Sequence, residues 1–317
     1  MPLHRTDRPD CRGGVITIGN FDGVHLGHRA MIGRLADVAA KHRVQAVAIT
    51  FDPPPVALLR PEKTPPRLTT LSRRAELLHD AGADEVVAYP VTHDVLALTP
   101  EQFFDDVIVG RLEAKAVVEG PNFRFGKARA GDVELLRTLA DAADIGCEII
   151  PPAAAGGDMV SSTRVRGLLA DGVVDAAATL LGRPHEVTGV VVRGAARGRV
   201  LGFPTANLDQ IETLVPAEGV YAGEARVDDD SFAAAVHIGT NATFAAATPT
   251  VEAHLVGFDG DLYGRELTVT FLERLRGTVR FDSPEALAAQ LRNDVDRAKA
   301  VHTAMTPSAA AETPTDE

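Results

Sequence analysis

The sequence of 317 residues contains little cysteine, because Cys11 and Cys147 are its two cysteines. Two isolated cysteines supply neither a disulfide framework nor the ligand set of a structural zinc site. The chain also lacks an excess of basic residues, since its formal net charge is −12 at pH 7. Nucleic acids and anionic membranes require a basic surface, so we expect neither as a partner. A phosphate ligand would have to be held by local cations.

Long apolar runs are also missing from the sequence. No stretch approaches the roughly 20 apolar residues that span a membrane. The first residues, with Arg5, Asp7 and Arg8, lack the apolar core of a secretory signal. We therefore expect a protein of the reducing cytoplasm. Hydrophobic residues make up 45% of the chain, enough to bury two domain-sized cores, and no internal repeat is visible.

Short apolar segments alternate with longer amphipathic ones over residues 15–150. The predicted strands are residues 15–18, 44–51, 85–89, 116–118 and 147–150. Strands that alternate with helices predict an α/β fold, a parallel sheet with helices on its faces. One helix is clearly signalled by Thr99 as N-cap, Pro100 at its first position and Gln102 in a capping box, and Gly110 marks its expected end.

Prolines gather after the second predicted strand. They are Pro53, Pro54, Pro55, Pro61, Pro65 and Pro66. Because so many prolines interrupt both helices and strands, we expect an ordered loop above the sheet here.

The pattern changes near Gly182. Beyond it, short β-branched segments are separated by Gly or Asp turns, at residues 186–192, 219–227, 233–238, 250–257 and 266–271. Such strands without intervening helices predict a small antiparallel β-barrel. A terminal helix is expected from Pro284 to Met305, with Ser283 as N-cap. We place the domains at 1–183 and 184–305, followed by a disordered tail over 306–317.

Two histidines lie between the first predicted strand and a helix, in the string GNFDGVHLGH of residues 19–28. His25 and His28 are three residues apart, at a helix start that offers free N–H groups to an anion. Imidazoles placed there can hydrogen-bond a phosphoryl oxygen and stabilise the charge of a departing group. The alternative is a glycine-rich turn with two solvated histidines.

A second informative stretch is RGAARGRVLGFPTAN, residues 193–207. Its glycines allow backbone amides to approach a phosphate, and its arginines offset the phosphate charge. Thr205 and Asn207 place oxygen atoms on one face of an extended segment, which suits Mg²⁺ beside a nucleotide. A hairpin with a basic turn would explain the glycines but not the Pro-Thr-Ala-Asn. The residues expected to hold the phosphate are Gly194, Arg199 and Gly202.

These motifs carry a resemblance to a known family. The string GNFDGVHLGH resembles the H-x-G-H signature of the nucleotidyltransferase superfamily, and GRVLGFPTAN is similar to the signature of riboflavin kinases. In this order they resemble the bacterial bifunctional riboflavin kinase/FMN adenylyltransferase (FAD synthetase) family. The resemblance implies a Rossmann-like nucleotidyltransferase domain followed by a riboflavin kinase barrel. The barrel would phosphorylate riboflavin with Mg²⁺-ATP to give FMN. The first domain would adenylylate FMN with a second ATP, giving FAD and pyrophosphate.

The resemblance also implies roles for single residues in the first domain. The nucleotide-binding residues of the first motif would be Gly19, Phe21, Asp22 and Gly27, beside the catalytic His25 and His28. The NFRFG string of residues 122–126 implies that Asn122 and Arg124 contact flavin or nucleotide, although a basic loop with two core phenylalanines is the alternative. The string SSTRVR precedes a helix expected from Gly167 to Asp171, and Arg166, three residues after Thr163, would share its helical face. The string resembles a triphosphate-binding element, which implies Ser162, Thr163 and Arg166; a plain N-cap is the alternative.

In the barrel, PTVEAHL of residues 249–255 is similar to the kinase family and implies that Glu252 is the base. A carboxylate there would orient the ribityl hydroxyl and accept its proton during phosphoryl transfer. Without the resemblance, Glu252 would be taken as one more charged strand residue.

One position departs from the family pattern, because Pro54 stands where relatives usually have a phosphate-site histidine. Proline donates no hydrogen bond. One alternative is therefore a protein that retains the kinase alone. Another is a non-catalytic flavin- or nucleotide-sensing module, which would predict damaged catalytic positions. The sequence leaves the oligomeric state open, a homo-oligomer included.

Overall fold

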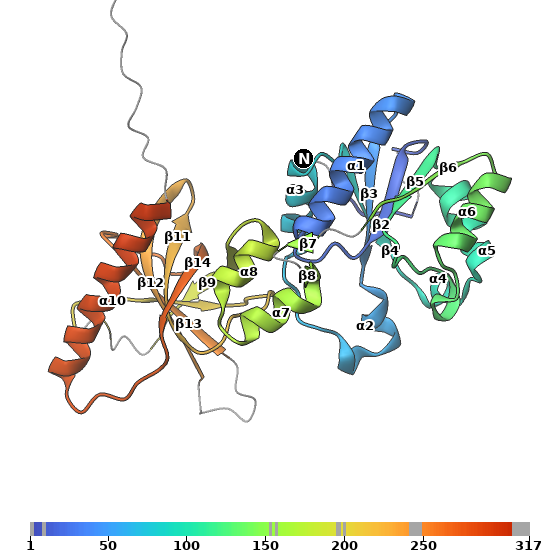
Figure 1. Cartoon of the computed structure of the whole chain (residues 1–317). Helices are drawn as coiled ribbons and strands as arrows, with labels where there is room; N and C mark the ends of the chain where they lie inside the picture. Colours follow the sequence, from blue (N-terminus) through green and yellow to red (C-terminus); the bar gives the residue numbers. More distant parts are fainter. Residues whose placement is uncertain are drawn as a thin grey trace, which may run out of the picture. The chain divides into compact units, whose positions relative to one another are not determined.

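The computed structural model describes residues 3–7, 11–151, 154–155, 158–194, 198, 201–240 and 249–305. The chain forms two compact units, residues 1–162 and 163–317 (Figure 1). The predicted tail over 306–317 and the predicted phosphate contact Arg199 lie outside the described residues.

The first unit is built on a six-stranded sheet in the order β1-β4-β3-β2-β5-β6. Its strands are β1 (Leu3–His4), β2 (Val15–Gly19), β3 (Ala46–Asp52), β4 (Glu85–Pro90), β5 (Ala116–Glu119) and β6 (Gly146–Ile149). All neighbours are parallel. The five predicted strands and the parallel sheet are confirmed; β1, which has two residues, was not predicted. A short hairpin, β7 (Ala154–Ala155) with β8 (Asp158–Met159), completes the strands of this unit.

Helices cover both faces of this sheet (Figure 1). They are α1 (Leu26–His42), α3 (Leu71–Asp80), α4 (His93–Ala97), α5 (Pro100–Phe103), η2 (Phe104–Arg111) and α6 (Val133–Ala142). The short η3 (Lys127–Arg129) lies in the loop between β5 and α6. One core joins α1 and α3 to the face that contains Val15. The other joins α5, η2 and α6 to the face that contains Ile16 and Ile18. Successive side chains of a strand point to opposite faces, so β2 contributes to both cores.

The direction of strand order reverses between β2 and β5. From β2 the chain adds β3 and β4 on one side, and it then returns to add β5 and β6 on the other. In open α/β sheets ligands bind at such a switch point, at the carboxyl ends of the strands. The β2–α1 turn and the loop after β5 both begin there.

The predicted capping box is present in this unit, whereas the predicted proline-rich loop contains short helices. The capping box of Thr99 and Gln102 is confirmed, and the helix it opens continues as η2 to Arg111, one residue beyond Gly110. The prediction of a loop throughout the proline-rich segment was wrong, because it contains α2 (Pro55–Leu59) and η1 (Pro61–Lys63). Each begins on a proline, whose fixed φ and missing N–H suit the first position of a helix.

The second unit contains the predicted antiparallel barrel, closed in the order β10-β13-β12-β11-β14-β9. Its strands are β9 (His185–Val192), β10 (Ala206–Asp209), β11 (Gly219–Val227), β12 (Asp230–Thr240), β13 (Pro249–Leu255) and β14 (Glu266–Arg276). Buried and partly exposed residues alternate along β9 and β13, as expected for strands with one face inside a barrel. β10 was not among the predicted strands.

Helices flank the barrel. The terminal helix α10 (Pro284–Met305) is confirmed, with the Ser283 hydroxyl accepting from the Ala286 N–H at 3.2 Å. Its buried Asp294 forms an ion pair with Arg276 at 2.7 Å. Two further helices, α7 (Ser162–Ala170) and α8 (Val174–Leu181), precede β9. The N–H of Ala217 donates to the Leu169 carbonyl at 2.9 Å, which attaches α7 to the barrel unit. The domain boundary at 183/184 stays a prediction.

Candidate functional site

The turn between β2 and α1 has a constrained backbone. Phe21 and Val24 adopt φ values of 46° and 40°, which are rare for bulky or β-branched residues. Both side chains are buried, and the Phe21 ring lies edge-on to His28 with centroids 5.2 Å apart. His25 is the N-cap of α1, and its Nδ1 accepts a hydrogen bond from the His28 N–H at 3.3 Å. Strained backbone of this kind is concentrated at functional sites.

The two imidazoles are stacked at the start of α1, with ring centroids 3.6 Å apart and an interplanar angle of 16°. Because Nδ1 of His25 accepts a hydrogen bond, the neutral ring carries its proton on Nε2. Burial, and then the neighbouring His25 and Arg74 side chains, hold the pKa of His28 well below its usual value. His28 is therefore neutral at pH 7. Its buried Nδ1 has no hydrogen-bond partner within the described part of the chain, which points to a ligand.

The buried Asp22 carboxylate accepts several hydrogen bonds. It accepts from the backbone N–H groups of Leu68 and Thr69, from the Thr69 hydroxyl, and from Arg74 at 3.0 Å. These contacts tie the β2–α1 turn to the segment before α3. Arg74 was not among the predicted site residues, because 52 residues separate it from Asp22. Direct contact between Asp22 and a nucleotide stays a prediction.

We expect Asp22→Ala to destabilise the N-terminal unit by about 3–5 kcal/mol, because it leaves a buried guanidinium without its carboxylate. Urea unfolding of the full chain measures the effect. Asp37→Ala is the matched control, since Asp37 is exposed and lies 3.7 Å from Arg34; its cost should stay below about 1 kcal/mol. Equal losses of unfolding free energy in the two variants would contradict the proposed role of Asp22 in holding the β2–α1 turn.

The loop after β5 is supported by aromatic packing. Phe125 is buried and stacks on Phe123 with centroids 5.5 Å apart. The two phenylalanines therefore serve the core, as the alternative interpretation expected. Asn122 and Arg124 are exposed, and Arg124 pairs with Asp132 at 3.2 Å. Their contact with flavin or nucleotide stays a prediction.

Glu119, the last residue of β5, is a buried acid that the sequence analysis did not select. Its Oε1 accepts a hydrogen bond from the Ile18 N–H at 2.7 Å. The sequence does contain a signal, since a carboxylate directly follows the apolar residues 116–118 of a buried strand. Such a group requires a partner or a raised pKa.

The serine-rich motif begins α7 rather than preceding it, because the helix starts at Ser162, before the predicted Gly167. The Ser162 hydroxyl donates to the Asp22 carbonyl at 2.8 Å, which places it at the β2–α1 turn. Thr163 and Arg166 follow on α7, and their spacing puts them on one helical face, as predicted. Their role in binding the triphosphate stays a prediction.

In the barrel, the predicted kinase residues come together across paired strands. Asn207 of β10 lies directly opposite Glu252 of β13 in the antiparallel ladder. The Thr205 hydroxyl lies 3.5 Å from Glu252 Oε2. Gly194 lies against Asn207, since a Cβ there would come within 2.4 Å of the Asn207 amide atoms. A larger residue at 194 would displace Asn207.

The turn before β10 is closed by its backbone. The Gly198 carbonyl accepts from the N–H groups of Leu201 and Phe203 at 3.1 and 2.8 Å. Gly202 has a φ of 85°, which disfavours any other residue there. The His254 ring lies 2.7 Å from the Pro204 carbonyl through Nδ1, so β13 holds the end of this turn beside Thr205.

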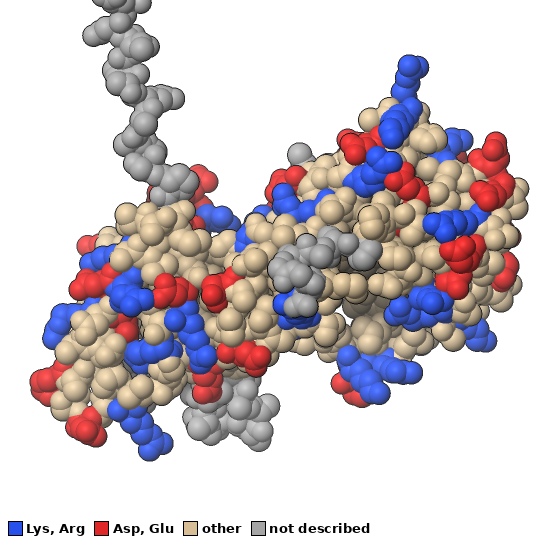
Figure 2. Space-filling view, in the orientation of Figure 1, with Lys and Arg blue, Asp and Glu red and all other residues tan. Residues whose placement is uncertain are grey.

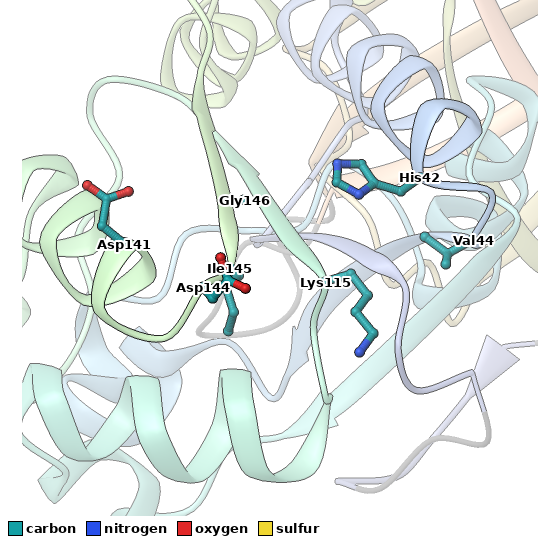
Figure 3. A pocket seen from close by; sticks show the side chains of 7 residues that line it. All are labelled: His42, Val44, Lys115, Asp141, Asp144, Ile145 and Gly146. Carbon is teal, nitrogen blue, oxygen red and sulfur yellow. The ribbon is translucent and has the colours of Figure 1, made fainter.

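A cavity of about 550 Å³ lies at the amino ends of the parallel strands, away from the β2–α1 turn (Figure 3). Its lining includes the residues that precede β3 and β5 and the first residue of β6: Val44, Lys115 and Gly146. Figure 3 shows the polar side chains of His42, Lys115, Asp141 and Asp144 pointing in different directions. Because ligands of open α/β sheets bind at the carboxyl ends, this cavity is not the candidate site.

The surface charge is mixed. On the face shown in Figure 2, Lys and Arg side chains are interspersed with Asp and Glu, and a group of cations lies over α2 and η1. The exposed Arg60 and Lys63 belong to that segment. None of the helices in the described part of the chain has the length and apolar character needed to cross a membrane.

Two protein families match the chain in succession. The FAD synthetase family matches residues 7–164, and the riboflavin kinase family matches residues 181–302. The bifunctional riboflavin kinase/FMN adenylyltransferase of Escherichia coli K12 is 36% identical over 92% of this chain and 94% of its own. The protein of the same description from Pseudomonas fluorescens is 38% identical over 93% and 94%.

A solved structure shares the fold along most of the chain. It is named a macrolide-efflux protein from Streptococcus pneumoniae, and it aligns with a TM-score of 0.85 and 29% identity. The alignment covers 94% of this chain and 98% of that one. The match therefore extends over both units.

Proposed function

This chain belongs to the family of bifunctional riboflavin kinase/FMN adenylyltransferases, and from that premise we propose which residues carry each of its two reactions. The C-terminal kinase domain phosphorylates riboflavin to FMN, and the N-terminal domain adenylylates FMN to FAD. Both reactions use ATP as the donor.

In adenylyl transfer the FMN phosphate attacks the α-phosphorus of ATP and pyrophosphate leaves, so the protein needs no nucleophile of its own. Its contribution is to position the two phosphates and to stabilise the charge that develops. We assign this to His25 and His28, supported by the N–H groups that begin α1. The observation that carries the assignment is the buried Nδ1 of His28 at this helix start, which has no hydrogen-bond partner among the described residues. Ser162, Thr163 and Arg166 would hold the triphosphate, and Asn122 and Arg124 the flavin or nucleotide.

In the kinase, Glu252 would orient the ribityl hydroxyl and accept its proton as the γ-phosphoryl group is transferred. The donor set beside it fits Mg²⁺, because Thr205 and Asn207 provide oxygen atoms next to one carboxylate. Magnesium is commonly bound by few protein oxygens together with substrate phosphates. When bound, the ion would neutralise phosphate charge; Gly194 and Gly202 would let the backbone approach the phosphates.

The direct test is to incubate the pure protein with riboflavin, ATP and Mg²⁺ and to separate the flavins by chromatography. Formation of FAD supports the proposed assignment of both reactions to this chain. Accumulation of FMN alone would indicate the kinase-only alternative, and unchanged riboflavin would indicate a sensing module.

The departure from the family pattern at Pro54 leads to a separate prediction. Pro54 precedes α2 with φ −64° and ψ 143°, a conformation that histidine also adopts, so Pro54→His should fit without strain. We expect it to raise the rate of FMN adenylylation about 10- to 100-fold, because it supplies a charge-assisted hydrogen bond worth roughly 1.5–3 kcal/mol. The FMN-to-FAD rate measures this, and the kinase rate is the control. An unchanged or lower rate in the folded variant would mean that another group, such as Arg60 or Lys63, already fills the role.

A further inference from the structure

The backbone pairing between β2 and β5 stops early, at the switch point of the sheet. Val15 pairs with Ala116 and Ile16 with Val117, and the ladder has no further rung. On its other edge, β2 remains paired with β3 through Gly19. The backbone pairing of β2 with β5 therefore ends before the β2–α1 turn and the loop after β5, the two segments proposed to hold the substrates of adenylyl transfer.

The Glu119 side chain takes the place of the next backbone acceptor in the β2–β5 ladder. A continued ladder would give the Ile18 N–H a carbonyl of β5, and it instead donates to Glu119 Oε1 at 2.7 Å. The Glu119 backbone carbonyl meanwhile accepts from the Ile150 N–H at 2.9 Å, so β5 is held from its other side. At this level β2 and β5 are therefore linked by the Glu119 carboxyl group, and not by a hydrogen bond between their backbones.

The residues on either side of this hydrogen bond lead directly into the proposed site. Ile18 is followed by Gly19 and the β2–α1 turn, and Glu119 by Gly120 and the loop that carries Asn122. A Cβ on Gly120 would lie 3.3 Å from the end of Met31, so the loop starts against the first turns of α1. A change in the Ile18–Glu119 distance would shift both segments relative to each other.

The surroundings of Glu119 favour a neutral carboxylic acid. The residue is 2% exposed. Burial raises the pKa of Glu119 well above its usual value, although the Ile18 and Gly120 amides act in the opposite direction. A neutral acid still accepts a hydrogen bond from an amide, so the contact with Ile18 does not depend on a charge.

We infer that Glu119 is a positioning residue of the adenylyltransferase site, which sets the separation between the β2–α1 turn and the loop after β5. This inference rests on the proposed assignment of that site to His25 and His28. Glu119 acts through the Ile18 and Gly120 backbone and touches no reacting atom. Displacing either segment by about 1 Å is enough to lower a rate by on the order of 100-fold.

The test compares three substitutions in the full chain. Glu119→Gln keeps an acceptor of the same length and should leave kcat for FMN adenylylation within about 3-fold of the unchanged protein. Glu119→Leu has no acceptor, and Glu119→Asp is one methylene too short to reach Ile18. Both should lower this kcat about 10- to 100-fold at saturating FMN and ATP. Glu113→Gln, at an exposed glutamate that precedes β5, is the control for loss of a surface charge.

The kinase rate and thermal unfolding are measured on each variant. Rescue by glutamine with loss in leucine and aspartate, at an unchanged kinase rate, supports the inference. It is overturned if glutamine loses as much activity as leucine, or if a folded leucine or aspartate variant keeps full kcat. If Glu119→Leu does not fold, Glu119→Asp decides; failure of both to fold would mean a purely structural role and overturns it. Retention of FAD formation in His28→Ala would instead contradict the proposed site itself.

Discussion

FAD formation should fall at least 100-fold in His28→Ala, while phosphorylation of riboflavin continues at nearly its original rate. His28 lies at the helix start where the leaving pyrophosphate would gain charge, and its buried Nδ1 lacks a partner in the described parts of the chain. Removal of one preorganised donor at such a place costs about 100- to 1,000-fold in kcat. The measurement is the initial rate of FAD from FMN and ATP, with FMN formation from riboflavin recorded on the same preparation.

The same helix offers a matched control for this prediction. His42 ends α1 and is exposed, so His42→Ala removes an imidazole from α1 without touching the proposed site. It should change neither activity. Equal loss of both activities in His28→Ala would mean that the two reactions do not have separate sites. An FAD rate close to that of His42→Ala would return His28 to the alternative of an incidental turn residue.

Local patterns in the sequence were sufficient where one short segment determines the structure. The capping box at Thr99 is such a case, because donor and acceptor are three residues apart. The barrel strands other than β10 are another, since short β-branched segments between Gly or Asp turns predict strands without intervening helices. The helix start at residue 162 was placed too late, because three consecutive hydroxyl residues favour a cap before the helix as much as its first turn.

Contacts between distant segments could not be predicted in this way. Asp22 was recognised by its motif, but its ion pair with Arg74 depends on how α3 packs beside the turn. Glu119 was passed over because a single acid at a strand end is ordinary until its partner, the Ile18 N–H, is known. The His25–His28 spacing predicted a shared helix start, whereas the ring stacking, and the burial that lowers the pKa of His28, required coordinates. The sequence thus indicated candidate residues, and packing determined how they are held.

Replacement of Glu252 by glutamine should abolish most kinase activity, with FMN formation reduced about 100- to 10,000-fold. Glutamine keeps the size of the side chain and cannot accept the proton of the ribityl hydroxyl. Its amide still lies opposite Asn207 in the β10–β13 ladder, so the barrel should fold as before. Because the base acts in the transition state, kcat should fall while the KM values for riboflavin and ATP change little. Conversion of supplied FMN to FAD should remain intact.

Glu266→Gln is the control for this variant, since Glu266 begins β14 with an exposed side chain. It should leave both reactions unchanged, which excludes a general effect of one lost barrel charge. A rise in KM for ATP at constant kcat in Glu252→Gln would point to a role in binding Mg²⁺-ATP beside Thr205, 3.5 Å away, instead of proton transfer. An unaltered kcat and KM would leave Glu252 as a charged strand residue. The base would then have to be sought elsewhere around the Thr205–Asn207 segment.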